Sequence, residues 1–464
     1  MEKFDVVVIG GGPAGYPAAI RAAQLGGKIA LIEKEFVGGT CLNWGCIPTK
    51  AMLACSNLFW HTRHASEMGI SVQKASFDYK AVCERKNKVV EKLRDGVRHL
   101  LKANNVTVIQ GTASFLSRNV IQVKDGKETN SVEAANTIIA SGSVSAMPSF
   151  IPRHEKIVES RGFLDMTDLP SSLLILGGGV IGCEFACLAA QAGIEVTIVE
   201  MLEDIIFVLD TDVRKILRSY MEKELGIKII TGKPLSNIAV SSGKVKGTAG
   251  DQEVSADMML VAIGRKPFAG ELNLASIGIQ TDEKGFIPID KFCRTVQPTM
   301  FAAGDITAGS TQLAHAATSQ GICAAENILS GRRRPAETIV PACIFTTPEV
   351  ASVGLTEKTA KEKGIAFVTG KFPFAALGKA MAIGETNGFV KWLAEEKTGR
   401  LIGAHAVGPH ATELIAEAAV AVRSELTAEE LGRTIHCHPT ISESWMEAAH
   451  CVNGHCINLP PKKR

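Results

Sequence analysis

The sequence predicts an α/β protein in which two related strand–loop–helix–strand units are followed by a third unit of mixed α and β structure. Three observations support this fold class. A short apolar strand runs into a glycine-rich turn twice, at Gly10 and at Gly177, at an offset of 167 positions (177 − 10). The composition, with 46% hydrophobic and 21% charged residues in a chain of 464, is that of a globular protein. From residue 336 onward, strand-like runs surround a helical stretch at 411–424.

Composition and charge exclude several classes of protein. Lys plus Arg number 50 and Asp plus Glu number 48, so the chain has no electrostatic reason to bind nucleic acid or an anionic membrane. Twelve cysteines are too few for a secreted disulfide scaffold. The early uncharged run at 6–20 is too short to span a bilayer, and the N-terminus lacks the pattern of a secretory signal. We therefore expect a cytoplasmic protein with no membrane span.

The two glycine-rich units repeat one design. The first comprises a strand at 4–9, Gly10, Gly12 and Gly15, a helix to residue 25, a strand at 28–32 and Glu33. The second comprises a strand at 172–176, Gly177, Gly179 and Gly182, a helix to residue 192, a strand at 195–199 and Glu200. In each unit the acid follows the first glycine by 23 positions (33 − 10 and 200 − 177). Two copies of this pattern predict two Rossmann-like dinucleotide-binding units.

Each residue of the pattern has a physical task. The first glycine allows a tight turn, the second lets the backbone approach a pyrophosphate, and the third lets the helix pack against the strand. The helix N-terminus offers free N–H groups to the phosphates, and the acid accepts hydrogen bonds from ribose hydroxyls. Glu200 argues against NADP, because a carboxylate about 4 Å from a 2′-phosphate costs about 4 kcal/mol at an effective dielectric constant near 20. The second unit is therefore predicted to bind NAD.

A pair of cysteines follows the first acid closely. Cys41 and Cys46 are five positions apart, and Pro48 suits the first turn of a helix, which puts Cys46 at or near a helix N-terminus. This position favours the thiolate and lowers the pKa of the thiol. In a reducing compartment such a pair indicates redox or metal chemistry. Cys55 and His61 are poorly spaced as further metal ligands, and two ordinary buried thiols remain an alternative.

The segment at 38–50 resembles the redox-disulfide signature of the pyridine nucleotide–disulfide oxidoreductases. The two glycine fingerprints, Gly304-Asp305 and the segment at 434–443 match the same family in the same order, so the resemblance covers essentially the whole chain. It implies FAD at the first unit, NAD at the second and a homodimer built on the C-terminal α+β domain. Among its members the chain most resembles those that oxidise dihydrolipoamide. Their partners are the lipoyl-bearing proteins of 2-oxo-acid dehydrogenase or glycine-cleavage systems.

The resemblance also implies site residues. The catalytic set is a redox-active disulfide between Cys41 and Cys46, with His438 as the base and Glu443 as its orienting carboxylate. The residues implied at the cofactors, besides the fingerprint glycines and acids, are Lys50, Ser141, Gly142, Glu184, Gly264, Asp305, Leu313, Ala314 and His315. A dithiol attacks as a thiolate, and an imidazole titrates in the range needed to take its proton. Trp44 occupies a position where members more often carry Arg or Val.

Less specific interpretations remain open at three of these positions. Thr440-x-x-Glu443 also matches a helix capping box. His436 is an alternative base to His438, and a merely structural role is an alternative for His438. Without the resemblance, Lys50 is only a helix residue and Glu184 only a first-turn acid that the helix dipole favours.

The expected domain organisation has four segments. They are an FAD-binding domain at 1–147, an NAD-binding domain at 148–268, a second part of the FAD-binding or central domain at 269–335, and an interface domain for dimerisation at 336–464. The basic run at 332–334 is interpreted as a solvated linker.

Three other functions compete with dihydrolipoamide oxidation. A glutathione- or trypanothione-type reductase would prefer NADPH, which Glu200 disfavours. A mercuric-reductase-type enzyme carries adjacent C-terminal cysteines, whereas Cys451 and Cys456 are five apart; these two thiols could instead bind a metal or pack in the core. A flavoprotein subunit that no longer catalyses a reaction would not need both the Cys41–Cys46 pair and the His438–Glu443 pair.

Overall fold

The computed structural model describes residues 1–460, which form three sheet-centred units. The first sheet has seven strands in the order β3-β2-β1-β6-β5-β4, with β17 pairing with β6. Its strands are β1 (Glu2–Ile9), β2 (Ile29–Glu33), β3 (Thr107–Gln110), β4 (Thr112–Ser117), β5 (Val120–Asp125), β6 (Glu128–Ile139) and β17 (Met300–Ala302). Its helices are α1 (Gly15–Gln24), α2 (Gly39–Trp44), α3 (Cys46–Arg63), α4 (Tyr79–Ala103) and α8 (Ala314–Leu329). Strand β17 runs parallel to β6, so a segment near residue 300 completes the sheet that the N-terminus begins.

The second sheet consists of five parallel strands in the order β11-β10-β9-β15-β8. These are β8 (Ile157–Glu159), β9 (Ser172–Leu176), β10 (Glu195–Val199), β11 (Lys228–Ile230) and β15 (Met258–Val261). The associated helices are α5 (Ser160–Leu164), α6 (Val180–Gln191) and α7 (Thr211–Lys223). A three-stranded antiparallel sheet of β12 (Leu235–Ser241), β13 (Lys244–Ala249) and β14 (Gln252–Ala256) lies beside it, and β7 (Ser143–Ser145) pairs with β16 (Arg265–Pro267) between the first two units.

The C-terminal unit is an antiparallel five-stranded sheet in the order β18-β19-β22-β21-β20. Its strands are β18 (Ala342–Ile344), β19 (Glu349–Gly354), β20 (Phe367–Pro373), β21 (Phe389–Glu395) and β22 (Leu401–Gly408). Its helices are α9 (Glu357–Glu362), α10 (Gly378–Ile383), α11 (Ala411–Arg423), α12 (Ala428–Arg433) and α13 (Glu443–Val452). The indole rings of Trp392 and Trp445 meet in its core at 4.6 Å between centroids, and both are fully buried.

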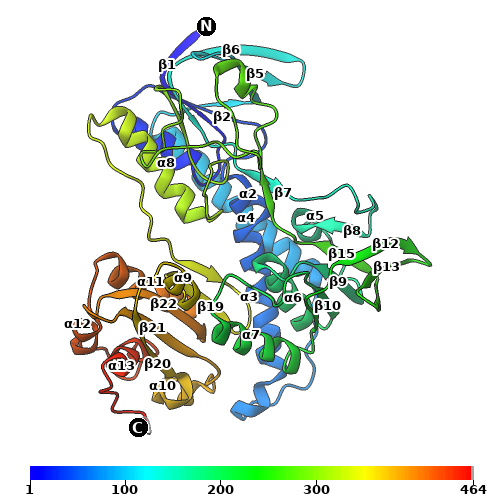
Figure 1. Ribbon diagram of the computed structural model, residues 1–464. Helices are drawn as coiled ribbons and strands as arrows, with labels where there is room; N and C mark the ends of the chain where they lie inside the picture. The colour runs from blue at the N-terminus through cyan, green and yellow to red at the C-terminus, as the bar shows by residue number, and fades with distance from the viewer. Residues whose placement is uncertain (461–464) are drawn as a thin grey trace.

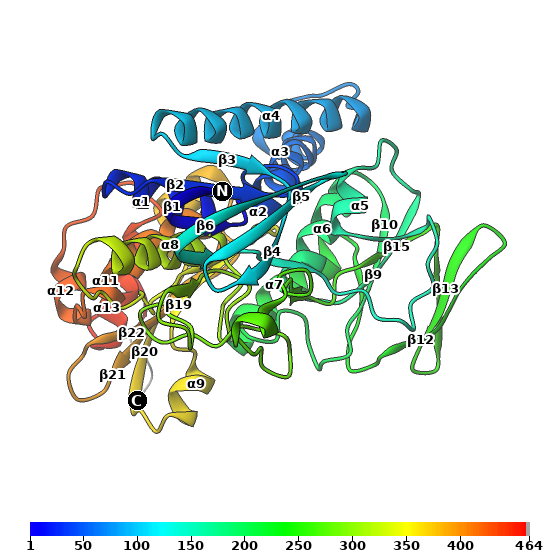
Figure 2. The same cartoon turned by 90° about the horizontal axis from the view of Figure 1, so that it is seen from above.

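The three units meet around α3. Figure 1 shows the first sheet at the top, the second at the right and the C-terminal unit at the lower left, with α3 running between them. Seen from above, α3 and α4 lie side by side along one edge of the molecule (Figure 2). Within α3, Ser56 donates to Gln191 of α6 (Oγ to Oε1, 2.8 Å), so the helix that follows the first fingerprint packs on the helix of the second.

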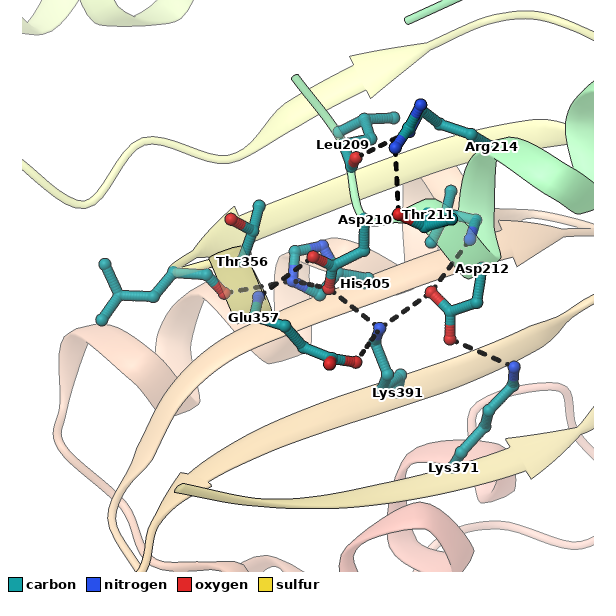
Figure 3. A network of polar contacts seen from close by, with 12 residues as sticks. Leu209, Asp210, Thr211, Asp212, Arg214, Thr356, Glu357, Lys371, Lys391 and His405 are labelled. Atoms are coloured by element: carbon teal, nitrogen blue, oxygen red, sulfur yellow. Dashed lines mark hydrogen bonds and ion pairs between the residues drawn. The ribbon is translucent and has the colours of Figure 1, made fainter. Parts of the chain in front are cut away.

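A buried charge cluster joins the second unit to the C-terminal sheet (Figure 3). The Lys391 ammonium on β21 lies 2.8 Å from Asp210, 2.8 Å from Asp212 and 3.0 Å from Glu357. The Lys391 side chain is only 2% exposed. His405 of β22 lies 3.4 Å from Asp210 on the same side. Three carboxylates, two from the start of α7 and one from α9, therefore converge on one cation.

Several element boundaries agree with the sequence-based expectation. The strands at 172–176 and 195–199 have the predicted bounds, and the helix predicted at 411–424 spans 411–423. The strand expected at 28–32 is shifted by one residue to Ile29–Glu33, so the acid closes the strand itself. Strand β15 ends at Val261, three residues before Gly264, whose φ is +109°. In residues 1–460 no helix has both the length and the apolar character needed to cross a bilayer.

Candidate active site

The two glycine-rich turns have the same geometry at the carboxyl ends of β1 and β9. Gly10 and Gly177 take positive φ values of +99° and +109°. A Cβ atom at Gly15 would overlap the carbonyl oxygen of Gly10, and one at Gly182 would overlap that of Gly177. The sequence therefore forms these turns because only glycine allows both the left-handed backbone and the close approach of helix to strand.

The middle glycines face open space, as a phosphate cradle requires. A Cβ at Gly179 would meet no heavy atom within 4 Å, and one at Gly12 would come no closer than 3.7 Å to the Cα of Gly39. Neither α1 nor α6 has a side-chain cap or an acidic residue in its first turn. Each helix therefore presents uncapped N–H groups and the positive end of its dipole to this space, which suits a pyrophosphate.

The two acids are fixed in the same way. Glu33 accepts hydrogen bonds from Gly11 N at 2.7 Å and from Glu35 N at 2.8 Å. Glu200 accepts from Gly178 N at 2.7 Å and from Leu202 N at 2.8 Å. Each carboxylate oxygen keeps a second acceptor position, so both side chains can still bind hydroxyl groups. The internal repeat is thus preserved down to single hydrogen bonds.

The cysteine pair lies between two helices. Cys41 is in α2, and Cys46 is the first residue of α3, as the position of Pro48 predicted. Gly45 separates the helices with φ −138° and ψ −110°. A Cβ at Gly45 would approach the carbonyl oxygen of Thr40 to 3.0 Å, so the tight connection between the helices favours glycine. Both cysteines are partly buried free thiols in this structure.

The two thiols differ in acidity. Cys46 accepts a hydrogen bond from the Cys41 thiol, and together with the charge of Lys50 this lowers the pKa of Cys46 to about 7, although burial and Glu184 act against it. The same hydrogen bond, together with burial, raises the pKa of Cys41 well above its ordinary value. When the pair is reduced, Cys46 is therefore the thiolate and Cys41 is the proton donor.

Lys50 and Glu184 form an ion pair beside these thiols. The Lys50 ammonium lies 2.8 and 2.7 Å from the two Glu184 oxygens, and Glu184 also accepts from Phe345 N at 3.0 Å. The ammonium lies 4.5 Å from the centroid of the Phe345 ring. Glu184 is the fifth residue of α6 and lies beyond the first turn, so its interpretation as a first-turn acid is wrong. It is 4% exposed and connects α3, α6 and the start of the C-terminal unit.

Asp305 belongs to a polar group that sequence reasoning missed. Ser143 donates to Asp305 at 2.6 Å, while Arg265 donates from Nε to Ser143 Oγ at 2.8 Å and from Nη2 to Ser143 O at 2.6 Å. Burial lowers the pKa of Arg265, while the charges of Asp305, Glu159 and Cys46 raise it. A cation therefore lies close enough to influence the cysteine site. The only sequence signal for Arg265 was its place after the last strand of the second unit.

The other implied cofactor residues lie around the ends of β6, β15 and β17. Ser141 donates from Oγ to the carbonyl of Phe268 at 2.7 Å. Gly142 and Gly264 take positive φ values of +72° and +109°. Leu313 is the N-cap of α8, and Ala314 begins the helix. His315 forms a hydrogen bond from Nε2 to the carbonyl of Pro341 at 2.6 Å, so its ring points toward the C-terminal unit.

Helix α8 begins like α1 and α6, with no side-chain cap and no acid in its first turn. It packs directly on the first glycine-rich turn, because Thr318 donates to Pro13 O at 2.9 Å. The N-termini of α1 and α8 therefore lie close together in the first unit.

The C-terminal histidine and acid meet as expected. His438 Nδ1 lies 2.9 Å from Glu443 Oε1, and the His438 side chain is 78% exposed. Glu443 Oε2 accepts from Thr440 N at 2.8 Å, which is one half of a capping box. The other half is missing, because the Thr440 hydroxyl contacts the Cys437 carbonyl and Ser442, and the helix starts only at Glu443. Glu443 therefore fixes both the segment and the histidine.

Within one chain, the structure does not bring every predicted residue together. In both views α13, which begins at Glu443, lies in the C-terminal unit, away from α2, the helix that contains Cys41 (Figures 1 and 2). Cys451 and Cys456 share a hydrogen bond, and Cys456 contacts Glu447 at 3.6 Å. Among residues 1–460 no group of three or more His, Cys, Asp or Glu side chains is arranged to hold a metal ion.

Trp44 belongs to an aromatic and cationic cluster. The Arg161 guanidinium lies 4.1 Å from the centroid of its ring, and Phe36 lies 6.2 Å away, centroid to centroid. This residue of the redox segment thus packs toward α5 of the second unit.

Comparison with known proteins agrees with this geometry. The family model described as pyridine nucleotide-disulphide oxidoreductase matches residues 4–321, and the dimerisation domain of the same family matches residues 340–449. The dihydrolipoyl dehydrogenase of Chlamydia pneumoniae is 42% identical over 461 residues, covering 99% of both chains. That of Geobacillus stearothermophilus is 39% identical, covering 99% of this chain and 98% of its own.

Solved structures show the same architecture. LpdA from Mycobacterium tuberculosis matches with a TM-score of 0.89 at 28% identity, covering 97% of this chain and 99% of its own. The HOCl-induced flavoprotein disulfide reductase RclA from Escherichia coli matches with a TM-score of 0.86 at 29% identity, covering 95% and 98%.

Proposed function

The chain belongs to the pyridine nucleotide-disulphide oxidoreductase family, and from this premise we propose that it oxidises protein-bound dihydrolipoamide to lipoamide with NAD⁺ as the final acceptor. The observation that carries the proposal is the Cys41–Cys46 pair, with one thiol acidified and the other a proton donor. Full-length relatives at about 40% identity are named dihydrolipoyl dehydrogenase. The absence of an adjacent C-terminal cysteine pair disfavours a mercuric reductase.

The two glycine-rich turns fit the two cofactors that the family implies. We propose FAD on the first cradle, with Gly10, Gly12, Gly15 and Glu33 around its adenosine and pyrophosphate. The uncapped start of α8 and Asp305 would face the rest of FAD. We propose NAD on the second cradle, held by Gly177, Gly179, Gly182 and Glu200. FAD supplies two-electron transfer between a dithiol and a nicotinamide; the protein groups bind, orient and move protons.

The proposed first step is proton removal from the substrate. Because His438 Nδ1 faces Glu443, its proton lies on Nδ1 and Nε2 is free to take a proton from a thiol of dihydrolipoamide. The resulting thiolate attacks Cys41 Sγ of the oxidised pair. A sulfur–sulfur bond forms between substrate and Cys41, and the Cys41–Cys46 bond breaks with its electron pair on Cys46.

The second step releases the product. The other substrate thiol loses its proton to solvent and, as a thiolate, attacks the substrate sulfur of the mixed disulfide, which closes lipoamide. Cys41 leaves and receives the proton held by His438, and Cys46 stays as a thiolate because its pKa is about 7. Two electrons and two protons have then left the substrate; the electrons reside in the Cys41–Cys46 pair. Lys50 stabilises the new charge on Cys46.

We propose that the base comes from a second subunit. His438 is exposed, helix α13, which begins five residues after it, lies away from α2 (Figures 1 and 2), and residues 340–449 match a dimerisation domain. A homodimer would bring His438 of one subunit to the thiols of the other. The other proposed partner is a lipoyl-bearing protein of a 2-oxo-acid dehydrogenase or glycine-cleavage system.

The test is NADH formation from NAD⁺ and dihydrolipoamide by the FAD-loaded dimer. Cys41→Ser removes the attacked sulfur and should abolish turnover, to below about a thousandth of the wild-type rate, because no mixed disulfide can form. Cys55→Ser is the matched control: Cys55 lies in α3, the helix that Cys46 begins, and is partly buried with its thiol bonded to Ala51 O. It should leave the rate within about twofold of wild type.

A parallel assay separates the alternatives. Reduction of glutathione disulfide with NADPH, without dihydrolipoamide turnover, would favour a reductase of the same family. No turnover in either assay, with flavin bound to the protein, would contradict the proposed substrate.

A further inference from the structure

A second histidine–carboxylate pair lies two residues from the proposed base. His436 Nε2 lies 2.7 Å from Glu417 Oε1 of α11, and its Nδ1 lies 2.9 Å from the backbone carbonyl of Thr434. The His436 side chain is 6% exposed, whereas that of His438 is 78% exposed. His436 is therefore a buried and fully bonded ring on the segment that carries an exposed one.

The partners of His436 determine its protonation. A backbone carbonyl can only accept a hydrogen bond, and an ionised carboxylate can only accept. Both ring nitrogens must therefore donate, which requires the imidazolium form. Hydrogen bonding to Glu417 raises the pKa of His436, against the opposing effect of burial. Neutral His436 would leave one short nitrogen–oxygen contact without a proton.

The charge of His436 reaches the proposed catalytic pair. The Glu443 carboxylate, which holds His438, also raises the pKa of His436, so the two groups interact through space. By reciprocity the His436 cation stabilises ionised Glu443. The charged groups that act on the ring are Glu417 on α11 and Glu443 on α13.

The pair also anchors the segment mechanically. Residues 434–442 between α12 and α13 form no regular helix or strand. At its start Thr434 donates to Glu430 O at 2.9 Å, and His436 ties the next turn to α11. A base presented from such a segment needs external fixation, because a misplacement of about 1 Å can cost about 100-fold in rate.

We propose that His436 is a positioning residue for the dithiol reaction: held as an imidazolium by Glu417 and the Thr434 carbonyl, it fixes the segment that presents His438, and its positive charge opposes protonation of that base. The inference rests on the proposed function. His436 itself does not exchange protons with the substrate, because both of its nitrogens are occupied.

The test compares the pH dependence of kcat/KM for dihydrolipoamide in three forms of the dimer. In His436→Gln the cation is lost while Glu417 stays negative, so the proton affinity of His438 rises. The acidic limb of the profile should move to higher pH by a few tenths of a unit, and kcat at pH 7 should fall about tenfold. In the double variant His436→Gln with Glu417→Gln, the pair is neutral overall, as in the wild type. Its acidic limb should return to the wild-type position.

Two readouts separate the outcomes. NADH-dependent reduction of ferricyanide does not use the dithiol base, and it should be unchanged in both variants if they are folded. An acidic limb that stays in place in the single variant, or moves equally in the double variant, overturns the inference. Nitrogen-15 NMR of histidine-labelled protein provides a second test, since His436 should keep both N–H protons at pH 8. If the wild type itself does not oxidise dihydrolipoamide, the proposed function fails, and the NMR result still decides the charge of His436.

Discussion

At the scale of single residues, the acidity of Cys46 is the property on which the proposed chemistry depends. Its place at the first residue of α3 could be predicted from Pro48 two positions later. The groups that set its pKa come from elsewhere in the chain. The Cys41 hydrogen bond and the Lys50 charge lower the pKa, whereas burial and Glu184 raise it. The balance leaves Cys46 as the more acidic of the two thiols.

Lys50→Met tests this balance. Without the ammonium, Glu184 acts on Cys46 unopposed, so the pKa should rise from about 7 by about one unit or more. The measurement is the rate of iodoacetamide modification of the reduced protein against pH, with mass spectrometry to locate the label on Cys46. Lys50→Arg keeps the charge and serves as the control, with an inflection that stays near 7. An unchanged inflection in the methionine variant would show that the lysine does not tune the thiol.

At the scale of elements, the two glycine-rich turns separate a folding requirement from a binding requirement. The third glycine of each fingerprint is needed for helix packing, because a side chain there would overlap the carbonyl of the first glycine. The second glycine faces open space. Folding alone therefore does not explain why position 179 is glycine, and proximity to a pyrophosphate does.

Two alanine variants of the second unit distinguish these roles. Gly182→Ala forces a Cβ into the Gly177 carbonyl and should destabilise the unit by about 1–3 kcal/mol or more. Gly179→Ala has room for its methyl group and an ordinary φ of −77°, so its melting temperature should match the wild type. Its KM for NAD⁺ should rise about tenfold, because the methyl group occupies the approach of the phosphates. Equal NAD⁺ affinity in Gly179→Ala would argue against the cradle.

These elements also show which features of the structure the sequence alone can predict. The internal repeat predicted both turns, both acids and the strands that flank them, because each pattern lies within about 25 consecutive residues. The internal repeat could not predict contacts between distant segments. Lys50 meets Glu184 across 134 positions, and Arg265 meets Ser143 across 122. The first pair was expected only from a family resemblance, and the second was missed, because neither residue type is unusual in its local context.

At the scale of the whole molecule, the buried cluster around Lys391 holds the second unit against the C-terminal sheet. Asp210 and Asp212 come from the start of α7, and Lys391 comes from the middle of β21 (Figure 3). Asp210 also accepts from Glu357 N at 3.0 Å, which fixes the start of α9. A cluster of this kind specifies one arrangement of two units, because a shifted arrangement would leave several buried charges without partners.

Lys391→Met is the variant that tests this role, and Lys371→Met is its matched control. The two lysines are register partners on β20 and β21, and both contact Asp212, but Lys371 is 43% exposed. Loss of Lys391 leaves carboxylates buried without their cation and should cost about 3–5 kcal/mol, whereas loss of Lys371 should cost no more than about 1 kcal/mol. Thermal unfolding should show a midpoint lower by several degrees for Lys391→Met alone.

The effect should also depend on pH with a defined sign. Burial alone would raise the pKa of Asp212, but hydrogen bonds and charges from Lys391 and Lys371 lower it below its ordinary value. A depressed pKa contributes stability that is present above the ordinary pKa of about 3.9 and is lost as the pH falls through the lower, folded-state value. The difference in midpoint between wild type and Lys391→Met should therefore be largest near neutral pH and shrink below about pH 4. A difference that is constant from pH 7 to pH 3 would mean that Lys391 acts through packing and not through its charge.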